Sequence, residues 1–534
     1  MRTATVSNAT SHGDPALSQA EVIDFLANVD SYDTPVARVD RIETHGALVF
    51  LAGNDVFKIK RAVRFPYMDF STLELRRRAC AREIEVNAPH APGLYLGAVA
   101  ITPRADGKLS IGGDGEPVEW AVHMRRFADA DLLSNLAETS GIGAPLARQI
   151  ADAVIVYHRA APISRAPAPY DQMAGTIAEV VEGLGASGCG LPAGLIVEFE
   201  TGCRRQLDVC RTILQQRAGA GFVRRCHGDL HLANIVMWQG RPTMFDALEF
   251  DEALATTDTL YDLAFLLMDL DRRGNRLAAN VVLNRYLWHS QQILDLDGLA
   301  ALPLFLGLRA GIRAMVLAQR AAQVAEAPGA AARKSARGYL AAAVGYLSPP
   351  KPLLIAVGGL SGTGKSTMAA ALAPMIGPTP GAIHLRSDLE RKTLFGVEET
   401  ERLSAECYSR EANERVYALL GSKAQSALAA GHAVITDAAF LRAEERQEIE
   451  SVARSLSLPF HGLWLTAPPD TLLARVAARS GDASDATVDI VRQQLALGAE
   501  SGNWARIDAG GSPGQALDAA RELLRTCTTA GATR

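Results

Sequence analysis

The sequence predicts two domains of different fold class that are joined by a short linker. Residues 18–346 have the pattern of an α+β domain, because short apolar runs fill 35–125 and apolar residues at helical spacing follow, from about 130 to 345. After the linker, residues 347–352, strand-like and helix-like segments alternate, which predicts an α/β domain with a parallel sheet over 353–527. Two prolines in the linker end the preceding helical pattern. A chain of 534 residues is also too long for one ordinary core.

The first domain divides into a small β-rich lobe, about 18–126, and a larger helical lobe, about 127–346. We expect one helix in the small lobe, over 71–88, where the sequence reads STLELRRRACAREIEVNA. Four apolar runs of this lobe predict strands: 46–53, 55–61, 94–102 and 118–127. A small β-rich lobe followed by a helical lobe is the outline of a protein-kinase-like fold.

The second domain has five short apolar runs that predict strands. They cover 353–357, 382–386, 432–436, 461–465 and 504–508, with helical patterns between them. This alternation is typical of a parallel sheet with helices on both faces.

Composition limits the classes of function. The chain is 48% apolar with a formal net charge of −5, so nucleic acid is not an expected partner. No segment has the length and charge pattern of a signal peptide or a membrane span; the nearest, 299–318, contains Arg309 and Arg313 and is expected to be a buried helix. Seven scattered cysteines without metal spacing fit a reducing compartment. We therefore expect a cytoplasmic protein; the sequence does not indicate its oligomeric state.

A phosphate-binding loop begins the second domain. Gly359, Gly364, Lys365 and Ser366 fit the Walker A pattern at every defined position, between a buried strand and an Ala-rich helix. Backbone N–H groups of such a loop converge on phosphate oxygens, the lysine adds a point charge, and the serine ligates Mg²⁺. The other loop residues expected to contact nucleotide are Ser361, Gly362, Thr363 and Thr367.

Four further residues of this domain are candidates for the same site. Asp437 ends the strand-like run AVITD, where a carboxylate suits Mg²⁺; the alternative is a helix N-cap. Asp388 follows the second strand and is placed to hold a substrate hydroxyl, and Arg391 is placed to hold an anionic group or is a solvated helix arginine. Arg475 and Arg479 lie four residues apart and form either a lid over the phosphates or an ordinary basic helix face.

Together, GGLSGTGKST, the Asp388 segment, Asp437 and the RxxxR…DASDA run resemble small P-loop kinases related to gluconate kinase, with zeta-toxin and chloramphenicol-kinase relatives sharing the outline. The resemblance covers residues 352–525. It implies that Asp388 acts as the catalytic base; it does not identify the acceptor.

A second phosphate-handling motif lies in the first domain. The run HGDLHLAN gives His227, Asp229 and Asn234 the spacing H-x-D-x₄-N, in which the Asp accepts the acceptor-hydroxyl proton and the Asn holds Mg²⁺. A hairpin with its turn at Gln239-Gly240 then leads to Asp246, the expected second metal ligand. The alternative is a polar loop. The motif resembles the aminoglycoside-phosphotransferase branch of the kinase-like fold, over about 20–345.

That resemblance implies a lysine–glutamate pair and an adenine-binding connection in the small lobe. The run DVFKIKRAV offers Lys58 and Lys60, which point to the same face of a strand; Lys58 is preferred because its surroundings are more apolar. Glu83 is the preferred partner and Glu85 the second choice. The backbone around Met124 is expected to meet adenine.

Two departures from the kinase pattern concern the first domain. The hairpin expected to cover the phosphates has only Gly46 and Gly53, and Asp246 is followed by Ala-Leu instead of Phe-Gly. The whole chain thus resembles an aminoglycoside-phosphotransferase-like kinase fused to a P-loop kinase. This implies a bifunctional phosphotransferase that uses ATP and Mg²⁺ on hydroxyls of small molecules such as a sugar or polyol. The alternatives are one catalytic P-loop kinase with a nucleotide-sensing kinase-like domain, and a toxin-like or stress-response NTPase.

Overall fold

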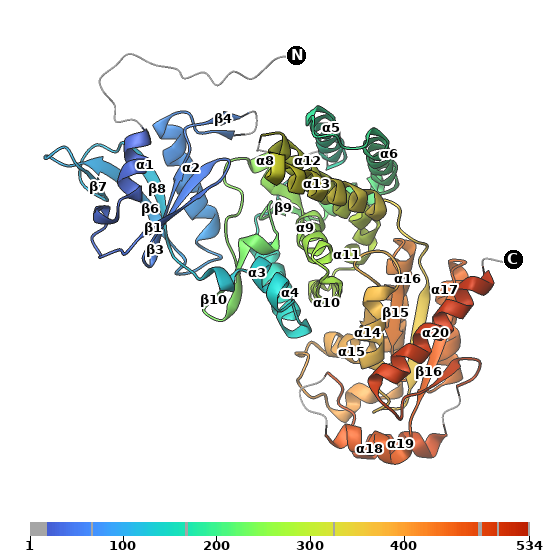
Figure 1. The fold of residues 1–534 in the computed structure, drawn as a ribbon. Coiled ribbons are helices and arrows are strands. Elements are labelled where there is room, and N and C mark those ends of the chain that lie inside the picture. The colour runs from blue at the N-terminus through green and yellow to red at the C-terminus, as the bar shows by residue number, and fades with distance from the viewer. Residues whose placement is uncertain are drawn as a thin grey trace. The chain divides into compact units, whose positions relative to one another are not determined.

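The computed structural model describes residues 19–65, 68–165, 169–323, 326–478, 483–498 and 501–531. The chain divides into two compact units, and many of their elements are labelled in Figure 1. The first unit comprises Met1–Leu136 and Arg225–Thr256, and the second comprises Ala137–Arg224 and Thr257–Arg534. The lobe and domain boundaries expected from the sequence stay predictions.

The first unit is built on a six-stranded antiparallel sheet in the order β1-β2-β3-β8-β6-β7. Four of these strands coincide with the four predicted runs. The strands are β1 Val39–Glu43, β2 Ala47–Ala52, β3 Asp55–Lys60, β6 Tyr95–Pro103, β7 Leu109–Ile111 and β8 Glu119–Arg125. A short hairpin, β4 Arg64–Phe65 with β5 Met68–Asp69, lies before the predicted helix.

Two helices pack on this sheet. The predicted one, α2 Leu73–Asn87, begins at Thr72, whose side chain accepts from the backbone N–H of Leu75. Its buried Cys80 packs with Val56 and Val122 of the sheet. The expectation of a single small-lobe helix is wrong, because α1 Gln19–Ala27 buries Val22 and Leu26 against Phe50 and Ile59.

The HGDLHLAN segment of the first unit continues into the predicted hairpin. Strands β10 Ile235–Trp238 and β11 Arg241–Met244 pair antiparallel, and the turn residues Gln239 and Gly240 both have positive φ, 51° and 77°. Those angles match the turn that two-residue hairpins prefer. A short helix, α8 Glu252–Ala255, follows.

Helices dominate the first half of the second unit. Their bounds are α4 Ala144–Ala160, α5 Pro169–Ala186, α6 Ala193–Val209, α7 Arg211–Gly219, α9 Thr259–Arg272, α10 Arg276–Ser290, α11 Ile293–Asp297, α12 Leu302–Gln323 and α13 Glu326–Tyr346. The remaining short elements near the unit boundaries are α3 Leu133–Thr139, β9 Val223–Arg225 and β12 Thr256–Asp258. Buried Arg217 ties this region together through ion pairs of 2.8 Å to Asp258 and 2.9 Å to Asp295.

One helical stretch of the described chain, Ile293–Ala322, is long and apolar enough to cross a membrane by length and composition. Its mean hydropathy is 1.6, and 67% of its apolar window is buried against the rest of the protein. Burial of this extent is what the core helix of a folded domain shows, and the stretch includes the segment expected to be a buried helix.

The second half of this unit is the predicted α/β domain. Its five strands are all parallel, in the order β14-β15-β13-β16-β17. Each lies within two residues of a predicted run: β13 Leu354–Gly359, β14 Ile383–Arg386, β15 Val434–Asp437, β16 Phe460–Thr466 and β17 Ala505–Asp508. The helices are α14 Lys365–Leu372, α15 Ser387–Phe395, α16 Arg410–Ala429, α17 Ala443–Ser455, α18 Pro469–Ala477, α19 Val488–Leu497 and α20 Pro513–Gly531. The fold class predicted for both parts is therefore confirmed.

The edge strand β14 is covered by helix α10 of the helical half. Asn284 accepts from the backbone N–H of His384 at 2.7 Å, and Asn280 donates to the backbone carbonyl of Ala382 at 3.0 Å. These side chains satisfy backbone groups that an uncovered edge strand would expose. The P-loop sheet is thus completed by a helix from the other half of the unit.

Close packing in β16 gives a stability prediction. A Cβ on Gly462 would lie 2.3 Å from the Trp504 ring, so Gly462→Ala should destabilise the protein by about 1–3 kcal/mol through overpacking. Urea unfolding followed by tryptophan fluorescence measures the change. The matched control is Gly421→Ala in α16, where the nearest atom to the new Cβ is 3.9 Å away; this change should be neutral or stabilising. Equal effects of the two substitutions would contradict the packing shown at Gly462.

Candidate active sites

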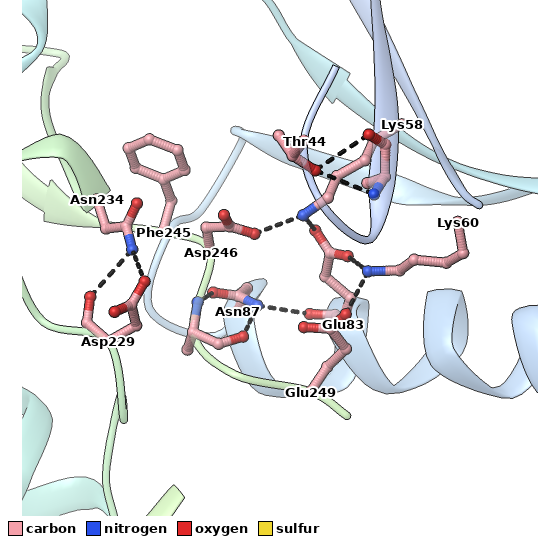
Figure 2. A network of polar contacts seen from close by, with 12 residues as sticks. Thr44, Lys58, Lys60, Glu83, Asn87, Asp229, Asn234, Phe245, Asp246 and Glu249 are labelled. Atoms are coloured by element: carbon pink, nitrogen blue, oxygen red, sulfur yellow. Dashed lines mark hydrogen bonds and ion pairs between the residues drawn. The ribbon is translucent and has the colours of Figure 1, made fainter. Parts of the chain in front are cut away.

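In the first unit, Lys58 of β3 lies between two carboxylates (Figure 2). Its Nζ is 2.9 Å from Oε1 of Glu83 and 2.5 Å from Oδ1 of Asp246. Burial lowers the pKa of Lys58, but Asp246 and Glu83 outweigh that effect and raise the pKa well above its usual value. Lys58 is therefore a fixed positive charge that touches the predicted metal ligand.

The structure brings both candidate lysines to Glu83, which the sequence did not anticipate. Lys60 Nζ is 2.5 Å from Oε2 of Glu83 and also pairs with Glu249. Its side chain is 2% exposed, whereas that of Lys58 is 13% exposed and faces Asp246. Glu85, the second-choice glutamate, pairs with Arg82 at the surface. The contact of Lys58 with Asp246 favours Lys58 and Glu83 as the pair, and the choice between the two lysines stays a prediction.

Asp246 is held in an unusual backbone conformation. Its φ is 60°, a left-handed value that a residue other than glycine adopts only when its surroundings impose it. Tyr95 Oη accepts from the Asp246 N–H at 2.9 Å, and Asn87 accepts from the next N–H, that of Ala247, at 2.8 Å. Neither Tyr95 nor Asn87 carries a motif that sequence reasoning could have used. Together they aim the carboxylate at Lys58.

The HGD loop places Asp229 and Asn234 together (Figure 2). Asn234 donates to Oδ2 of Asp229 and to its backbone carbonyl, each at 3.0 Å, and His231 lies 3.3 Å from the same carboxylate. His227 is buried and bonds the Phe245 carbonyl at 2.9 Å, which fixes the loop to the segment that carries Asp246. Burial would raise the pKa of Asp246, but Lys58 holds it below its usual value even though Asp229 opposes this.

The other two expectations for this lobe fit the structure less closely. Only Thr44, His45 and Gly46 connect β1 to β2, so the loop that would cover the phosphates is a short turn. Met124 lies inside β8 and pairs with Val56 on one side and Tyr95 on the other. The strand continues to Arg125, so Met124 lies one residue before its end, and contact of this backbone with adenine stays a prediction.

The donor set of this centre suits a magnesium ion. Asn234 and Asp246 supply an amide and a carboxylate oxygen, the ligand types that Mg²⁺ prefers, and Asp229 lies next to both. The Asp246 side chain is 41% exposed, so it is reachable from solvent. Assignment of these residues as metal ligands stays a prediction.

The P-loop of the second unit has the backbone that its glycines predict. Gly359, Gly362 and Gly364 have φ of 137°, 88° and 87°. A Cβ at Gly359 would lie 2.5 Å from the Leu465 carbonyl oxygen, so the strand–loop junction admits only glycine. Helix α14 begins at Lys365 and directs its N-terminus at the loop.

Side chains fill part of the phosphate loop. Lys365 Nζ donates to the Leu360 carbonyl at 3.1 Å, and Thr363 Oγ1 donates to the same oxygen at 2.8 Å. Gln494 of α19 accepts from the Ser361 N–H at 2.8 Å, where a phosphate oxygen would be expected. Ser366 and Thr367 lie in the first turn of α14. Gln494 was not predicted, because no sequence spacing links it to the loop.

Asp437 and Asp388 are two carboxylates with opposite pKa shifts. Burial raises the pKa of Asp388, and the nearby Asp437 raises it further. Asp437 is also buried, but His384, Arg386 and Lys365 hold its pKa below the usual value. His384 Nε2 is 3.5 Å and Arg386 Nε 3.8 Å from Oδ2 of Asp437. Such separation is typical of a pair in which one group stays ionised and the other exchanges a proton.

The predicted arginines have other partners. Arg391 is buried, donates to the Cys407 carbonyl and to Asn413 at 2.7 Å each, and lies over the Tyr408 ring. Arg475 donates to the carbonyls of Ala509 and Gly511. These contacts are within the protein, so roles toward a substrate or phosphate stay predictions. Arg479 lies outside the described residues.

The DASDA run contributes a contact that the lid hypothesis did not include. Asp485 accepts from Lys392 at 2.8 Å and from Tyr408 at 2.7 Å. Burial opposes ionisation, but these two donors hold the pKa of Asp485 below its usual value. Asp485 is therefore held to α15 by Lys392 and to the 405–408 turn by Tyr408.

Comparison with known proteins identifies relatives of this chain. The uncharacterized protein Rv2004c of Mycobacterium tuberculosis is 30% identical over 504 residues, which are 91% of this chain and 96% of that protein. The uncharacterized protein Mb2027c of Mycobacterium bovis matches to the same extent. The chain belongs to the family of these two mycobacterial proteins. In addition, a family model described as an AAA domain matches residues 354–499, which contain the P-loop.

Solved structures resemble each part. A gluconokinase from Sinorhizobium meliloti is 19% identical and covers 33% of this chain and 97% of its own, with a TM-score of 0.25. A choline/ethanolamine kinase family protein from Mesorhizobium loti is 14% identical and covers 61% and 99%, with a TM-score of 0.38. Aminoglycoside 2'-phosphotransferase-IIIa in its GDP complex is 12% identical and covers 61% and 98%, with a TM-score of 0.37.

Kinases and a phosphotransferase are thus among the structures found for both parts, as the two resemblances predicted. Likenesses at these TM-scores carry no argument about what this chain binds or transfers. The functional interpretation rests instead on its own residues: the P-loop, the HGDxxxxN loop and the charges around them.

The two lysines of the first unit can be separated by substitution. The test uses a Lys365→Ala background, which leaves only the first centre to bind nucleotide. In it, Lys58→Met should weaken the binding of a non-hydrolysable ATP analogue with Mg²⁺ at least tenfold. Lys60→Met should leave that affinity within about threefold but lower stability by about 3–5 kcal/mol, because Glu249 loses its buried partner. Calorimetry measures the affinity and urea unfolding the stability. The reverse affinity pattern would assign the nucleotide-binding role to Lys60.

Proposed function

We propose that this chain is a phosphotransferase with two nucleotide centres, each of which transfers the γ-phosphoryl group of ATP to a hydroxyl of a small molecule. The observation that supports the proposal is that each unit brings together a lysine, oxygen-bearing side chains of the kinds that bind Mg²⁺ and a further carboxylate. An ATP donor implies the cytoplasm as the compartment.

In the first centre, Glu83 holds Lys58 in position to neutralise phosphate oxygens of the nucleotide. Asn234 and Asp246 would hold Mg²⁺, which neutralises charge on the phosphates when bound. Asp229, oriented by Asn234, accepts the proton of the acceptor hydroxyl. In the same step, the hydroxyl oxygen bonds to the γ-phosphorus while the bond from that phosphorus to the leaving ADP oxygen breaks. The side chains position and neutralise; they form no covalent intermediate.

In the second centre, the backbone N–H groups of the P-loop and Lys365 bind the phosphates, and Ser366 and Asp437 would hold Mg²⁺. Asp388 takes the acceptor proton. Burial and the nearby Asp437 raise the pKa of Asp388, which suits a group that accepts a proton, and the lowered pKa of Asp437 suits a metal ligand. Gln494 must release the Ser361 N–H before a phosphate oxygen can bind there.

A second candidate function is that the first unit senses nucleotide without turnover. Its phosphate-covering loop is the three-residue turn Thr44–Gly46, and the ion pair between Lys58 and Asp246 occupies both the phosphate-binding and the metal-binding side chain. In this case only the P-loop centre would catalyse.

Transfer of labelled phosphate distinguishes the two candidates. The protein is incubated with a small-molecule cell extract and ATP labelled with ¹⁸O in the γ-phosphoryl group, and labelled products are identified by mass spectrometry. Two working centres predict at least two products. The amount of one product should fall at least a hundredfold in Asp229→Asn, which removes the proton acceptor of the first centre, and the amount of the other should fall as much in Lys365→Ala, which removes the phosphate-binding charge of the second centre.

The control is Glu85→Gln, a surface change that should alter no product. Products that depend only on Lys365 would favour the sensor. Absence of any labelled product with the wild type would contradict the proposed activity.

A further inference from the structure

A cavity of ≈ 160 Å³ lies beside the P-loop centre and is lined by both halves of the second unit. Ser366, Arg386 and Lys423 line it from the P-loop half, and Asn284, Trp288 and Arg148 from the helical half. A cavity of about 150 Å³ can hold a molecule the size of benzene, so this volume suits a small organic molecule.

The cavity is adjacent to the predicted chemistry. Ser366, the expected Mg²⁺ ligand of the P-loop, is one of its lining residues. Arg386 and His384, which also line it, both contact Asp437. Leu389 lines it as well and directly follows Asp388, the expected base. A molecule bound in the cavity would therefore lie next to the predicted Mg²⁺ ligands and the predicted base, which is where the acceptor of the phosphoryl group has to bind.

The charges of the cavity favour an anion. Two of its cations are already neutralised, because Lys423 pairs with Glu390 at 2.6 Å and Arg285 pairs with Glu399. Arg148 is exposed and has no carboxylate partner among the described residues. Arg386 is also paired, because its Nε lies 3.8 Å from Oδ2 of Asp437. The lining cation without a carboxylate partner among the described residues is therefore Arg148, and a carboxylate or phosphate group would complement it.

The helical wall is built to stay in place. Asn284 is fixed by the N–H of His384 and by the carbonyl of Ala382. Trp288 donates to Thr393 of α15 at 3.2 Å, and the Arg285 guanidinium lies 5.0 Å from its ring centre. An aromatic edge beside fixed amides and cations is the kind of surface that orients a hydroxylated small molecule.

We infer that this cavity is the acceptor pocket of the P-loop centre, that α10 and Arg148 supply its second wall, and that its ligand is a small hydroxylated organic anion. The inference rests on the proposed function, since it assigns a substrate class to the P-loop centre. It gives the helical half of the unit a direct role in choosing the acceptor of the other half. The transfer is the one described above: the acceptor oxygen bonds to phosphorus, ADP leaves and Asp388 takes the proton.

Binding of matched probes to the full chain tests this inference. Glucose 6-phosphate and glucuronate carry an anionic group on the glucose ring, and glucose is their neutral match. Calorimetry without nucleotide should show at least one anionic probe with a Kd at or below about 1 mM and glucose at least tenfold weaker. A preference for glucose 6-phosphate assigns a phosphorylated ligand, and a preference for glucuronate assigns a carboxylated one.

Variants locate the binding. Arg148→Gln and Trp288→Ala should each weaken the binding of the preferred probe at least tenfold. Arg148→Gln is a surface change that should not affect folding. Arg320→Gln, an exposed arginine elsewhere on the helical half, should change it less than twofold. Equal affinity for glucose, or unchanged affinity in both Arg148→Gln and Trp288→Ala, would overturn the inference.

Turnover separates this inference from the proposed function. The preferred probe should stimulate ADP release from Mg-ATP, and Lys365→Ala should abolish that stimulation. Binding without stimulation, while the P-loop still binds the ATP analogue, would overturn the acceptor assignment alone. If the wild type binds the probe but does not bind the ATP analogue at its P-loop, the proposed function is overturned instead.

Discussion

A charge that is removed from water needs an opposite charge beside it, and this requirement organises both candidate centres. In the first unit, Lys58, whose side chain is 13% exposed, lies between Glu83 and Asp246. In the second, Asp437 is buried against His384 and Arg386. Each arrangement leaves a group of fixed charge that faces the space where phosphate or metal would bind. Preorganised charge of this kind is the main contribution that a protein makes to phosphoryl transfer.

The second unit shows that its two halves are not merely adjacent along the chain. Asn280 and Asn284 of α10 satisfy backbone groups of β14, and Arg285 pairs with Glu399. The edge strand of the P-loop sheet, which would otherwise be exposed, is thus protected by the helical half. This dependence gives a physical reason for the two halves to occur in one chain.

Motifs within short stretches of sequence were enough to predict both folds and the main candidates. The five parallel strands and the β10–β11 hairpin follow from local patterns of apolar and turn residues, because strand period and turn geometry are local properties. The phosphate loop is predictable for the same reason, since its three glycines each serve a backbone conformation.

The remaining features depend on contacts between distant segments. Period-two alternation puts Lys58 and Lys60 on one face, and only the position of Asp246, 188 residues after Lys58, distinguishes them. Tyr95 and Gln494 carry no spacing signal because each acts through one contact across the fold. The second small-lobe helix, α1, was missed although it is amphipathic. The expectation that adenine meets the backbone around Met124 stays a prediction, since Met124 lies near the end of β8.

The most direct test of two nucleotide centres is the stoichiometry of binding. A non-hydrolysable ATP analogue with Mg²⁺ is titrated by calorimetry into the wild type, Lys365→Ala and Asp246→Ala. The account predicts two sites per chain in the wild type and one in each variant, because the two substitutions remove charges from different units. A single site that is lost only in Lys365→Ala would contradict a nucleotide centre in the first unit.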